Sequence, residues 1–544
     1  MTQEINVRVE PKIASIPELL KKYLARHTSI PEARILRVDV VRRSIDARQR
    51  RVMVNLTVRI HIDEIEPIAP YELPSYELLS EDAPHAIVVG AGPAGLFASL
   101  ALIEKGFRPI LLERGKDVDS RRKDLAAISR QDAVDPDSNY SFGEGGAGAY
   151  SDGKLFTRSK KRGNVSKILN ILHAHGAPDD ILVDAHPHIG TNLLPDIIKS
   201  IRKTIERCGG QVHFRTRVER LLFNDKKTEV IGVEAQNLST RHTDPDSNFN
   251  SVHKFYGPVI LATGHSARDV YQSLLNDNVE LQPKGIAVGV RLEHPSHLID
   301  QLQYHSEEGR GKYLPAAEYS MLTRVDDRAV YSFCMCPGGV IVPAATGPGQ
   351  LVVNGMSPSN RGTRWSNSGM VVEVLPEDIV GDDVLRVMRF QEKIEKDFYE
   401  DAKESQNAPA QRMIDFVRGR QSTTLPPTSY APGIHPARID LLLPASVSLR
   451  LKKGFEIFGQ KQKGFLTNDA VLIGAETRTS APVRIPRDTE SLRHVSLRGL
   501  YPAGEGAGYA GGIVSAAIDG ERCAMALVNT YGNQEKGPEI QCGD

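Results

Sequence analysis

Residues 85–115 read HAIVVGAGPAGLFASLALIEKGFRPILLERG, and this stretch decides the fold. HAIVV is a short apolar strand, the glycine turn opens a helix that ends near Gly106, and RPILL is a second strand. Gly90 permits the tight turn, Gly92 lets the backbone approach a diphosphate, and Gly95 allows close packing between helix and strand. The unit therefore predicts a dinucleotide-binding βαβ fold.

An acidic residue, Glu113, ends the second strand about 20 residues beyond the glycine turn. A carboxylate at this point can accept hydrogen bonds from both ribose hydroxyls of an adenosine, whereas it would repel a 2′-phosphate. The helix that begins at Pro93 and Ala94 directs its amides and the positive end of its dipole at the diphosphate. The motif by itself fits NAD as well as FAD.

Composition limits the class of protein. The 544 residues suffice for roughly two to four domains, and 68 basic residues balance 68 acidic ones, so the net charge does not indicate a polyanionic partner. Five cysteines in this length are not typical of a disulfide framework, which favours a reducing compartment. The sequence shows no signal-peptide pattern and no uninterrupted apolar stretch of membrane-spanning length. We predict a cytoplasmic globular protein that does not enter a membrane.

The first part of the chain differs in charge from the rest. Residues 1–60 hold 13 basic and six acidic residues, whereas residues 61–85 hold seven acidic residues, four prolines and neither Lys nor Arg. INVRVE, IPELLKKYLARH, ILRVDVVRRSID and RRVMVNLTVRIHID have the patterns of a strand, a helix and two strands. We expect a basic βαββ module over residues 1–65 and an acidic, proline-containing linker over residues 66–84.

Two later segments favour FAD over NAD. VILATGHSA (259–267) is a buried strand that ends in a glycine turn, and GLYPAGEGAGYAGGIVSAAIDG (499–520) is a strand, a glycine turn and a helix of small residues. With the first unit they follow the order of the glutathione-reductase-like FAD superfamily, which the chain resembles. The resemblance implies a non-covalent FAD whose adenosine half is closed by the turn at Thr263 and Gly264. It also implies that Glu505 binds the ribityl chain and that the helix from Gly512 and Ile513 points at the pyrimidine edge of the flavin.

A narrower resemblance covers essentially the whole chain. It rests on NYSFGEGGAGAYSDGKL (139–155), PHIGTN (187–192), VRLEHP (290–295), FCMCPGG (333–339), VNGMS (353–357) and ETRTSAPVRI (476–485). These segments are similar to a little-characterised family of bacterial FAD-dependent dehydrogenases, which implies a fold and a cofactor more than a reaction. We predict an α/β protein with a discontinuous Rossmann-like FAD-binding domain and an inserted, mixed α+β substrate domain. The expected ranges are 85–280 and 466–544 for the first domain and 281–465 for the second.

The predicted cofactor contacts come from the βαβ unit, from the glycine-rich run at 143–148 and from the later turns. The glycines of the run let the backbone pass close to a flat ring and offer amides to it. The resemblance also places a cationic contact to the adenosine diphosphate at Arg121. The full predicted set is Gly90, Gly92, Pro93, Ala94, Gly95, Glu113, Arg114, Arg121, Gly145, Gly146, Gly148, Val218, Thr263, Gly264, Gly504, Glu505, Gly512 and Ile513.

Three side chains are candidates for catalysis, and each has a structural alternative. Lys154 can stabilise negative charge on reduced flavin or on a substrate oxygen, or it can pair with Asp152. His265 can act as an acid or base near the flavin, or loop backbone can satisfy its ring. Cys334 can be a catalytic thiol. However, Cys334 and Cys336, two residues apart on an extended strand, favour a buried pair over a redox dithiol, which usually has C-x-x-C spacing.

Two arginines, Arg478 and Arg484, flank a polar strand just before the C-terminal tail. We expect them to contact an anionic substrate, although an isolated arginine is more often a paired surface residue. The histidines at 173–188 do not form an arrangement that we can assign to a metal, so we predict no metal site.

The predicted function is that of an FAD-dependent oxidoreductase that transfers hydride between the flavin and an unidentified organic substrate. Only one strand–GxGxxG–helix unit is apparent, so NAD(P)H, if it is the electron donor, would have to dock transiently against the flavin. One alternative is an RNA-associated flavoprotein that binds phosphates through residues 1–65. Another is a flavin-bound sensor or scaffold without turnover. The sequence leaves the oligomeric state open.

Overall fold

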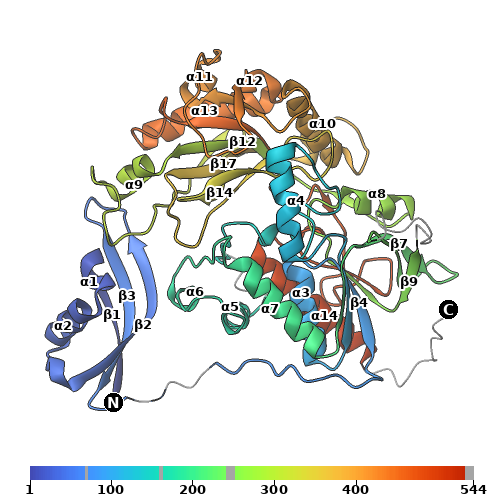
Figure 1. Ribbon diagram of the computed structural model, residues 1–544, viewed down its shortest axis with the longest axis horizontal. Coiled ribbons are helices and arrows are strands. Elements are labelled where there is room, and N and C mark those ends of the chain that lie inside the picture. The colour runs from blue at the N-terminus through green and yellow to red at the C-terminus, as the bar shows by residue number, and fades with distance from the viewer. Residues whose placement is uncertain (66, 68–70, 158–162, 240–250, 533–544) are drawn as a thin grey trace.

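The computed structural model describes residues 1–65, 67, 71–157, 163–239 and 251–532. Three of its sheets organise the chain: a three-stranded sheet near the N-terminus, a five-stranded sheet and a seven-stranded sheet. Figure 1 shows the N-terminal part at one side of the main body. Residues 71–84 contain no helix or strand, and they run in extended form along the main body to the strand that begins at His85.

The N-terminal module has its strands in the antiparallel order β1-β3-β2. Alternate residues of β3 are buried against Leu20 and Leu24 of α2, so one face of the sheet forms a small core. The order is that expected from the sequence, except that a short helix, Pro11–Ser15, precedes the expected helix, which begins at Pro17. Its elements are β1 (Thr2–Val9), α1 (Pro11–Ser15), α2 (Pro17–Thr28), the 3₁₀ helix η1 (Glu32–Arg34), β2 (Ile35–Asp46) and β3 (Met53–Ile62).

Most arginines of this module are paired with acidic residues. Arg43 of β2 donates hydrogen bonds to Asp180 and Asp184 at 3.0 and 2.6 Å, which joins the module to α6 (Asp180–Val183) of the main body. The pairs within the module join Arg8 and Arg48 to Asp46, Arg34 to Asp63, Arg37 to Asp39, Arg51 to Glu10 and Arg59 to Glu4. These pairs neutralise much of the charge from which the RNA alternative was inferred.

The five-stranded sheet is parallel throughout and has the order β22-β10-β4-β5-β6. Residues near the C-terminus thus add a strand to the sheet that the first βαβ unit begins. Because all strands run the same way, their carboxyl ends lie at one edge. The strands are β4 (His85–Val89), β5 (Arg108–Leu112), β6 (Gln211–His213), β10 (Val259–Leu261) and β22 (Leu500–Pro502).

Two helices, α3 (Pro93–Glu104) and α14 (Ile513–Tyr531), pack against each other beside this sheet (Figure 1). Residues 94–103 of α3 are all buried, which explains why this helix is apolar on every side. Gly520 makes the contact possible, because a Cβ atom there would lie 2.0 Å from the carbonyl oxygen of Ala94. Small residues therefore set the distance between the two helices.

The seven-stranded sheet has the order β13-β14-β17-β12-β20-β18-β19 and is antiparallel except for the β18–β19 pair. The boundary predicted at residue 465 falls too early, because β20 pairs with β12 inside this sheet. The apolar run VLIGAE fits a buried strand of either sheet, so the sequence could not assign it. The strands are β12 (Ile286–Pro295), β13 (Leu322–Val325), β14 (Arg328–Cys336), β17 (Trp365–Val374), β18 (Ala408–Arg412), β19 (Ile434–Pro436) and β20 (Val471–Glu476).

The remaining elements cover these sheets or connect them. A separate antiparallel sheet has the order β7-β8-β9, and two pairs of strands, β11 with β21 and β15 with β16, complete the described strands. The strands are β7 (Thr216–Phe223), β8 (Val230–Asn237), β9 (Val252–Tyr256), β11 (Gln282–Pro283), β15 (Val340–Pro343), β16 (Val353–Met356) and β21 (Val483–Arg484). The helices are α4 (Val118–Gln131), η2 (Gly146–Gly148), α5 (Val165–Ala174), α7 (Leu194–Arg207), α8 (Arg268–Asn276), α9 (Ser296–Tyr304), η4 (Pro376–Asp378), α10 (Arg386–Asp401), α11 (Met413–Arg418), α12 (Ile439–Leu442) and α13 (Ala445–Lys461).

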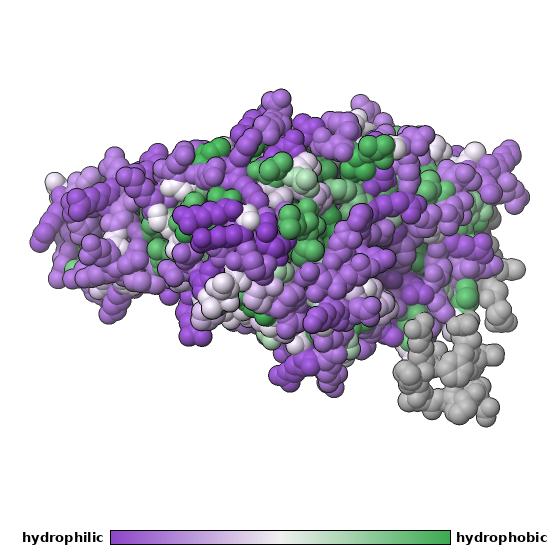
Figure 2. Space-filling view, turned by 90° about the horizontal axis from the view of Figure 1, so that it is seen from above, coloured by the Kyte–Doolittle hydropathy of each residue, from purple (hydrophilic) through white to green (hydrophobic). Residues whose placement is uncertain are grey.

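The surface seen in Figure 2 is mostly hydrophilic, with hydrophobic residues in small separate patches. Among the described residues, no helix combines the length and the apolar composition that crossing a bilayer requires.

A substitution at Gly520 tests the contact between α3 and α14. Alanine would favour the helix itself by about 1 kcal/mol, but its Cβ would collide with backbone of α3. Since backbone cannot move aside as a side chain can, we expect Gly520→Ala to lower the free energy of unfolding by about 1–3 kcal/mol. Thermal unfolding followed by circular dichroism measures the change. Asn529→Ala, at an exposed position of the same helix, is the control; a Gly520→Ala protein as stable as this control would contradict the packing.

Candidate functional site

A cavity of about 400 Å³ lies at the carboxyl edge of the parallel sheet. The ends of β4, β5 and β10 form its floor at Val89, Leu112 and Ala262. The seven-stranded sheet, the neighbouring β16 and the segment after β20 contribute to the opposite wall. Those residues are Phe333, Cys334, Asn354, Arg478 and Thr479. The cavity is therefore formed jointly by the parallel sheet and the unit built on the seven-stranded sheet.

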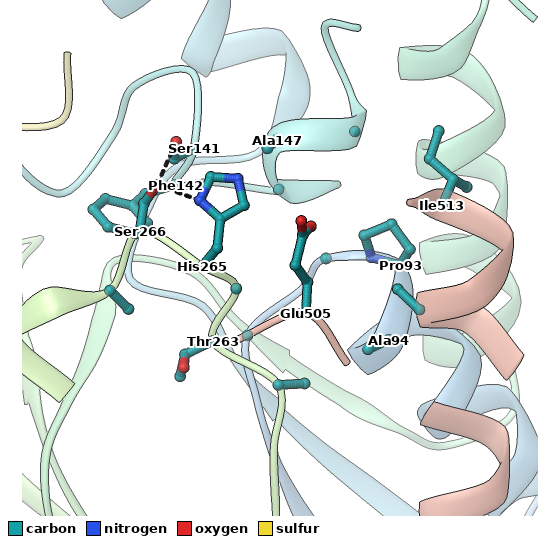
Figure 3. Close-up of a pocket in the computed structure, with 18 of the residues that line it drawn as sticks. Pro93, Ala94, Ser141, Phe142, Ala147, Thr263, His265, Ser266, Glu505 and Ile513 are labelled. Atoms are coloured by element: carbon teal, nitrogen blue, oxygen red, sulfur yellow. Dashed lines mark hydrogen bonds between the residues drawn. The ribbon is translucent and has the colours of Figure 1, made fainter. Parts of the chain in front are cut away.

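Two helices begin at this cavity. α3 starts after Gly92 and α14 starts after Gly512, and neither residue caps its helix with a side chain. Pro93, Ala94 and Ile513, from the first turns of the two helices, line the cavity (Figure 3). Each helix N-terminus carries a partial positive charge from its aligned peptide dipoles. The cavity thus favours an anionic ligand such as a diphosphate.

Glycines bring backbone close together at this end of the cavity. A Cβ atom on Gly95 would lie 1.9 Å from the oxygen of Gly90, so the helix packs directly on the turn before it. Gly92 faces Gly146 across open space, where a Cβ on Gly92 would meet no atom nearer than the Cα of Gly146 at 4.0 Å. Gly90, Gly92, Gly146 and Gly148, which the sequence predicts to contact the cofactor, line the cavity.

Three predicted glycines support the cavity from behind it. Gly95 packs on the turn as described, and Gly145 donates a hydrogen bond to the oxygen of Ala91 at 2.8 Å while facing Ile198 of α7. Gly504 lies against the side chain of Ala94. The structure therefore places these glycines outside the lining of the cavity.

The carboxylate of Glu113 lines the cavity and organises the backbone around it. Its Oε2 atom accepts a hydrogen bond from the amide of Ala91 at 2.8 Å. Its Oε1 atom accepts from Gly115 and Gly143 at 2.8 and 2.9 Å. The two loops that face each other across the cavity are thus tied to one side chain. Because a carboxylate oxygen has two lone pairs, Oε2 keeps one acceptor position for a ligand hydroxyl.

Arg121 is the predicted cofactor contact that the structure corrects. Its side chain is fully buried behind the glycine-rich loop and does not line the cavity. Its guanidinium donates hydrogen bonds to the carbonyl oxygens of Asn139, Glu144 and Gly146 at 2.7, 2.8 and 2.9 Å. Arg121 therefore holds the loop in shape instead of binding a phosphate. The sequence showed a cation near the loop but could not show on which side it lies.

Arg114 does line the cavity, beside the loop that Glu113 holds. It pairs with Asp137 and Asp269, both at 2.9 Å, and its guanidinium lies 4.3 Å from the ring centre of Phe142. These contacts fix a flat cationic group at the wall where the ribose is expected.

The turn after β10 forms the next part of the wall. Thr263, Gly264 and His265 line the cavity from this turn, Val218 lines it from β7, and Glu505 faces them from the C-terminal segment (Figure 3). Burial raises the pKa of Glu505 to about 7, against the opposing influence of Lys284. The protonation state of this carboxyl group is therefore sensitive to pH in the neutral range.

His265 is held in its neutral form. Burial, together with the nearby charges of Arg478 and Arg268, lowers its pKa to about 4. Ser141 donates to the hydroxyl of Ser266 at 3.3 Å, and that hydroxyl lies 2.8 Å from Nδ1 of His265 (Figure 3). With Nδ1 as the acceptor, the ring proton is on Nε2.

Lys154 lines the cavity and is paired with Asp152, which is its structural alternative, while its role toward flavin or substrate stays a prediction. Its ammonium group lies 3.3 Å from Oδ2 of Asp152 and donates a hydrogen bond to the carbonyl oxygen of Met335. Burial by itself would lower its pKa, but the thiols of Cys336 and Cys334 and the carboxylate of Asp152 outweigh burial and raise it. Lys154 is therefore a permanent positive charge at this wall.

The two predicted substrate arginines lie in different places. Arg478 is buried at the cavity wall, where Nη2 donates to Glu395 at 3.0 Å and Nη1 donates to Thr346 at 2.6 Å. Arg268 pairs with the same carboxylate at 2.8 Å, which leaves one excess positive charge in the cluster. Arg484 is exposed and lies over the ring of Tyr509, outside the lining of the cavity. The pattern that placed both arginines beside a polar strand could not separate these two positions.

Several lining residues were not predicted. Phe156 and Asn354 line the main cavity, and Glu476 lines a small pocket that adjoins it beyond His265 and Arg478. Burial raises the pKa of Glu476 to about 7, although Arg291 opposes this effect. A charged residue at the end of the apolar run VLIGAE was the signal that could have identified Glu476. Among the described residues, no group of three His, Cys, Asp or Glu side chains is close enough to hold a metal ion.

The chain is similar to an uncharacterised protein of Clostridium beijerinckii. The two are 40% identical over 531 residues, which is 94% of this chain and 96% of the clostridial protein. The chain belongs to the family of this clostridial protein. In the present chain, residues 285–479 match the domain family described as "FAD-dependent protein, C-terminal domain-like". Residues 1–61 match a domain of unknown function.

Solved structures with some likeness include a geranylgeranyl bacteriochlorophyll reductase-like protein of Thermoplasma acidophilum. It is 12% identical, with 83% of this chain and 80% of that chain covered and a TM-score of 0.36. A second is 3-ketosteroid-Δ4-(5α)-dehydrogenase of Rhodococcus jostii RHA1, at 13% identity, with 83% and 99% of the two chains covered and a TM-score of 0.34. At these sequence identities and TM-scores, the likeness supports no conclusion about the function of this chain.

FAD is the cofactor of this protein, as the sequence predicts. The residues that line the cavity fit FAD. Two helix N-termini without side-chain caps can bind its diphosphate, and the free acceptor position of Glu113 suits a ribose hydroxyl. Open space at Gly92, Gly264 and Gly512 leaves room for a ligand against the backbone, since a Cβ atom on Gly264 or Gly512 would meet no atom within 4 Å.

Gly92 offers a test of the diphosphate site that does not disturb the fold. Its backbone angles, φ −75° and ψ −177°, are open to any residue, and an added methyl group would occupy only cavity space. We expect Gly92→Ala to bind FAD about tenfold or more weakly, because this loss corresponds to about 1.4 kcal/mol. Flavin fluorescence titration measures the affinity.

The stability of the apoprotein should stay unchanged in the same variant. Gly347→Ala is the matched control, because Gly347 lies outside the cavity and an added Cβ atom would come no closer than 3.4 Å to its nearest neighbour, the side chain of Gln350. Unchanged FAD affinity in Gly92→Ala would show that the diphosphate does not bind at this turn.

Proposed function

We propose that this protein is an FAD-dependent oxidoreductase that transfers hydride between the flavin and a small, anionic organic substrate. The proposal rests on the cavity that the parallel sheet and the unit built on the seven-stranded sheet form together. One wall belongs to the dinucleotide fold, and the other presents Lys154, Cys334, Asn354 and Arg478 to the same space. When bound, FAD supplies the two-electron chemistry, while the protein supplies orientation and electrostatics.

The charged groups at the second wall support binding of an anion. Lys154 keeps its proton, and the cluster of Arg268, Arg478 and Glu395 has one more positive than negative charge. These charges lie in buried surroundings, where screening by water and salt is weak. They can attract a carboxylate or a similar group and stabilise negative charge that develops during the reaction.

His265 has a narrower role in this proposal. As a neutral ring with its proton on Nε2, it can donate one hydrogen bond toward the cavity. It cannot hold a second proton near pH 7, because burial and two arginines oppose the imidazolium form. His265 therefore orients a substrate or cofactor oxygen and is not the stored acid of the reaction.

An external electron donor has a defined place to approach. A second hollow of about 610 Å³, which we call the outer vestibule, adjoins the cavity at Phe156, Cys334 and the first turn of α14. It is lined by Phe156, Thr157, Cys334, Tyr509, Ala510, Gly511, Gly512, Ile513, Val514, Ser515, Ile518, Asp519 and Arg522. We propose that NAD(P)H, as a transient donor, reaches the flavin from here.

Anaerobic titration of the purified holoenzyme tests the function. We expect NADH, NADPH or a component of a metabolite extract to bleach the flavin absorbance, and a small anionic acceptor to restore it. A flavin sensor without turnover would instead be reduced slowly by every donor. Failure of all donors and acceptors to change the absorbance at a useful rate would contradict the proposed function.

Glu505 makes a prediction about pH. Because its pKa is raised to about 7, the group is largely neutral at about pH 6 and largely ionised at about pH 8. An ionised Glu505 opposes the negative charge that accompanies flavin reduction. We expect Glu505→Gln to match the wild-type reduction potential at about pH 6 and to exceed it by about 30 mV at about pH 8, since 30 mV is about 1.4 kcal/mol for two electrons.

Spectroelectrochemical titration at the two pH values measures these potentials. Glu521→Gln is the control, because Glu521 lies on α14 outside the cavity and pairs with Lys167. Equal potentials in Glu505→Gln and wild type at about pH 8 would show that Glu505 does not ionise beside the flavin.

A further inference from the structure

The segment Cys334-Met335-Cys336 departs from a regular strand at the end of β14. The register of β14 on β17 shifts between Phe333 and Cys336, which is a β-bulge. Cys334 has a φ of +43°, in the left-handed region that residues with a side chain adopt only at a cost in energy. In this bulge the Cys336 thiol donates a hydrogen bond to the carbonyl oxygen of Cys334 at 3.4 Å, and it is close enough to the Cys334 thiol for the two to shift each other's pKa. The strand expected from the sequence thus continues to Cys336 but contains a bulge, and Cys336 is buried as expected, whereas Cys334 is partly exposed.

Two cations from different elements hold the segment. Lys154 donates to the carbonyl oxygen of Met335, and Nη2 of Arg291 donates to the carbonyl oxygen of Cys334 at 2.7 Å. The same Nη2 atom lies 3.3 Å from the sulfur of Cys336. Positive charge close to a thiol stabilises its thiolate form.

These cations are fixed by their own partners. Arg291 is fully buried on β12 and contacts Glu476 at 3.2 Å and Asn367 at 2.9 Å. Lys154 is paired with Asp152, which also pairs with Arg361 at 2.7 Å. The positive charge beside the thiols is therefore a built feature of the site.

The two thiols differ in acidity. The hydrogen bond from Cys336 lowers the pKa of Cys334, and Lys154 and Arg291 lower it further against the effects of burial and Asp152. The pKa of Cys336 is raised by the same hydrogen bond and by burial. Glu476 and Glu505 also face Cys334, and a thiolate there raises the pKa of both. Cys334 is thus the nucleophilic member of the pair.

The position of Cys334 gives it access on two sides. It lines both the cavity that takes FAD and the outer vestibule, together with Phe156, Gly511, Gly512 and Ile513. Among these shared residues, Cys334 is the one with a redox-active side chain. Cys336 is fully buried behind it.

We propose that Cys334 and Cys336 form a redox-active dithiol that exchanges electrons with the flavin and with organic disulfides in the outer vestibule. This inference rests on the proposed function, because the flavin is the two-electron partner. In the internal step, the Cys334 thiolate and the Cys336 thiol together lose two electrons and one proton and form one S–S bond. The flavin accepts these two electrons and the proton. In the reverse direction the S–S bond breaks and the same thiolate and thiol are regenerated.

The external step follows ordinary thiol–disulfide exchange. The Cys334 thiolate attacks one sulfur of the organic disulfide, so that a mixed disulfide forms and one thiolate leaves. Cys336, after loss of its proton, then attacks Cys334, and the second thiolate of the substrate leaves. The reduced flavin afterwards regenerates the dithiol.

Electron counting tests the internal step. The oxidised holoenzyme is titrated anaerobically with dithionite while flavin absorbance is followed. We expect wild type to take up two electrons per flavin more than Cys336→Ser does. Cys208→Ser should match wild type, because Cys208 is buried outside the cavity and contacts Tyr76. Equal uptake by wild type and Cys336→Ser would overturn the proposal.

A measurement on the wild-type protein avoids dependence on variants that fail to fold. Trypsin releases residues 329–361, a peptide in which Cys334 and Cys336 are the only cysteines. We expect iodoacetamide to leave this peptide unlabelled in the oxidised holoenzyme and to label it twice after reduction and unfolding, as seen by mass spectrometry. Full labelling of unfolded protein from the oxidised state would overturn the proposal.

The external step is tested with 5,5′-dithiobis(2-nitrobenzoate) as the organic disulfide. When this probe is added to reduced holoenzyme without oxygen, the flavin absorbance should return in wild type and in Cys208→Ser, but about tenfold or more slowly in Cys334→Ser. Equal rates would overturn the role of Cys334.

Because dithionite replaces the biological donor in these experiments, a failed search for that donor would leave the dithiol results valid. Conversely, a donor that reduces the flavin while the dithiol tests fail would preserve the proposed function alone.

Discussion

Close approach of backbone around Gly90, Gly95 and Gly520 is the constraint on which the rest of the structure depends. Without side chains at these points, α3 packs on the turn that precedes it and α14 packs on α3. Both helices can then begin at one cavity, and their N-termini add positive potential to the same space. A strand from the C-terminal part closes the sheet that the first βαβ unit opens, so the cofactor site requires both ends of the main body.

The second wall of the cavity depends on buried ion pairs between distant segments. Arg478 and Arg268 share Glu395, Arg291 pairs with Glu476, and Arg361 pairs with Asp152. An isolated charge in such surroundings would be costly, so each cation needs its acidic partner to stay buried. These partners hold positive charge beside the cavity and beside the thiols of β14. Burial and the charges of Arg478 and Arg268 keep His265 neutral. Burial also raises the pKa values of Glu476 and Glu505 to about 7, although the nearby cations Arg291 and Lys284 oppose this effect.

Local patterns predicted many of the residues at the cavity because each belongs to a short motif. The first βαβ unit, the Thr263–Gly264 turn and the Gly512–Ile513 helix start all contribute residues to the lining of the cavity. Predictions about the direction of long side chains were weaker. Arg121 and Arg484 stand close to the site in sequence, yet one is buried behind the loop and the other is exposed outside it. The boundary at residue 465 was wrong because an apolar strand can pair in either sheet.

By itself the sequence determined the nucleotide-binding unit, the order of its parts and the strand–helix pattern of the N-terminal module, since glycine turns and periodic apolar residues act over a few positions. Only the tertiary structure decided which charges meet. The contacts of Lys154 with Met335, of Arg43 with Asp184 and of Arg291 with the turn at Cys334 join residues far apart in the chain. The acidity of a thiol or a carboxyl group depends on such contacts and on burial, and neither is encoded in a local pattern.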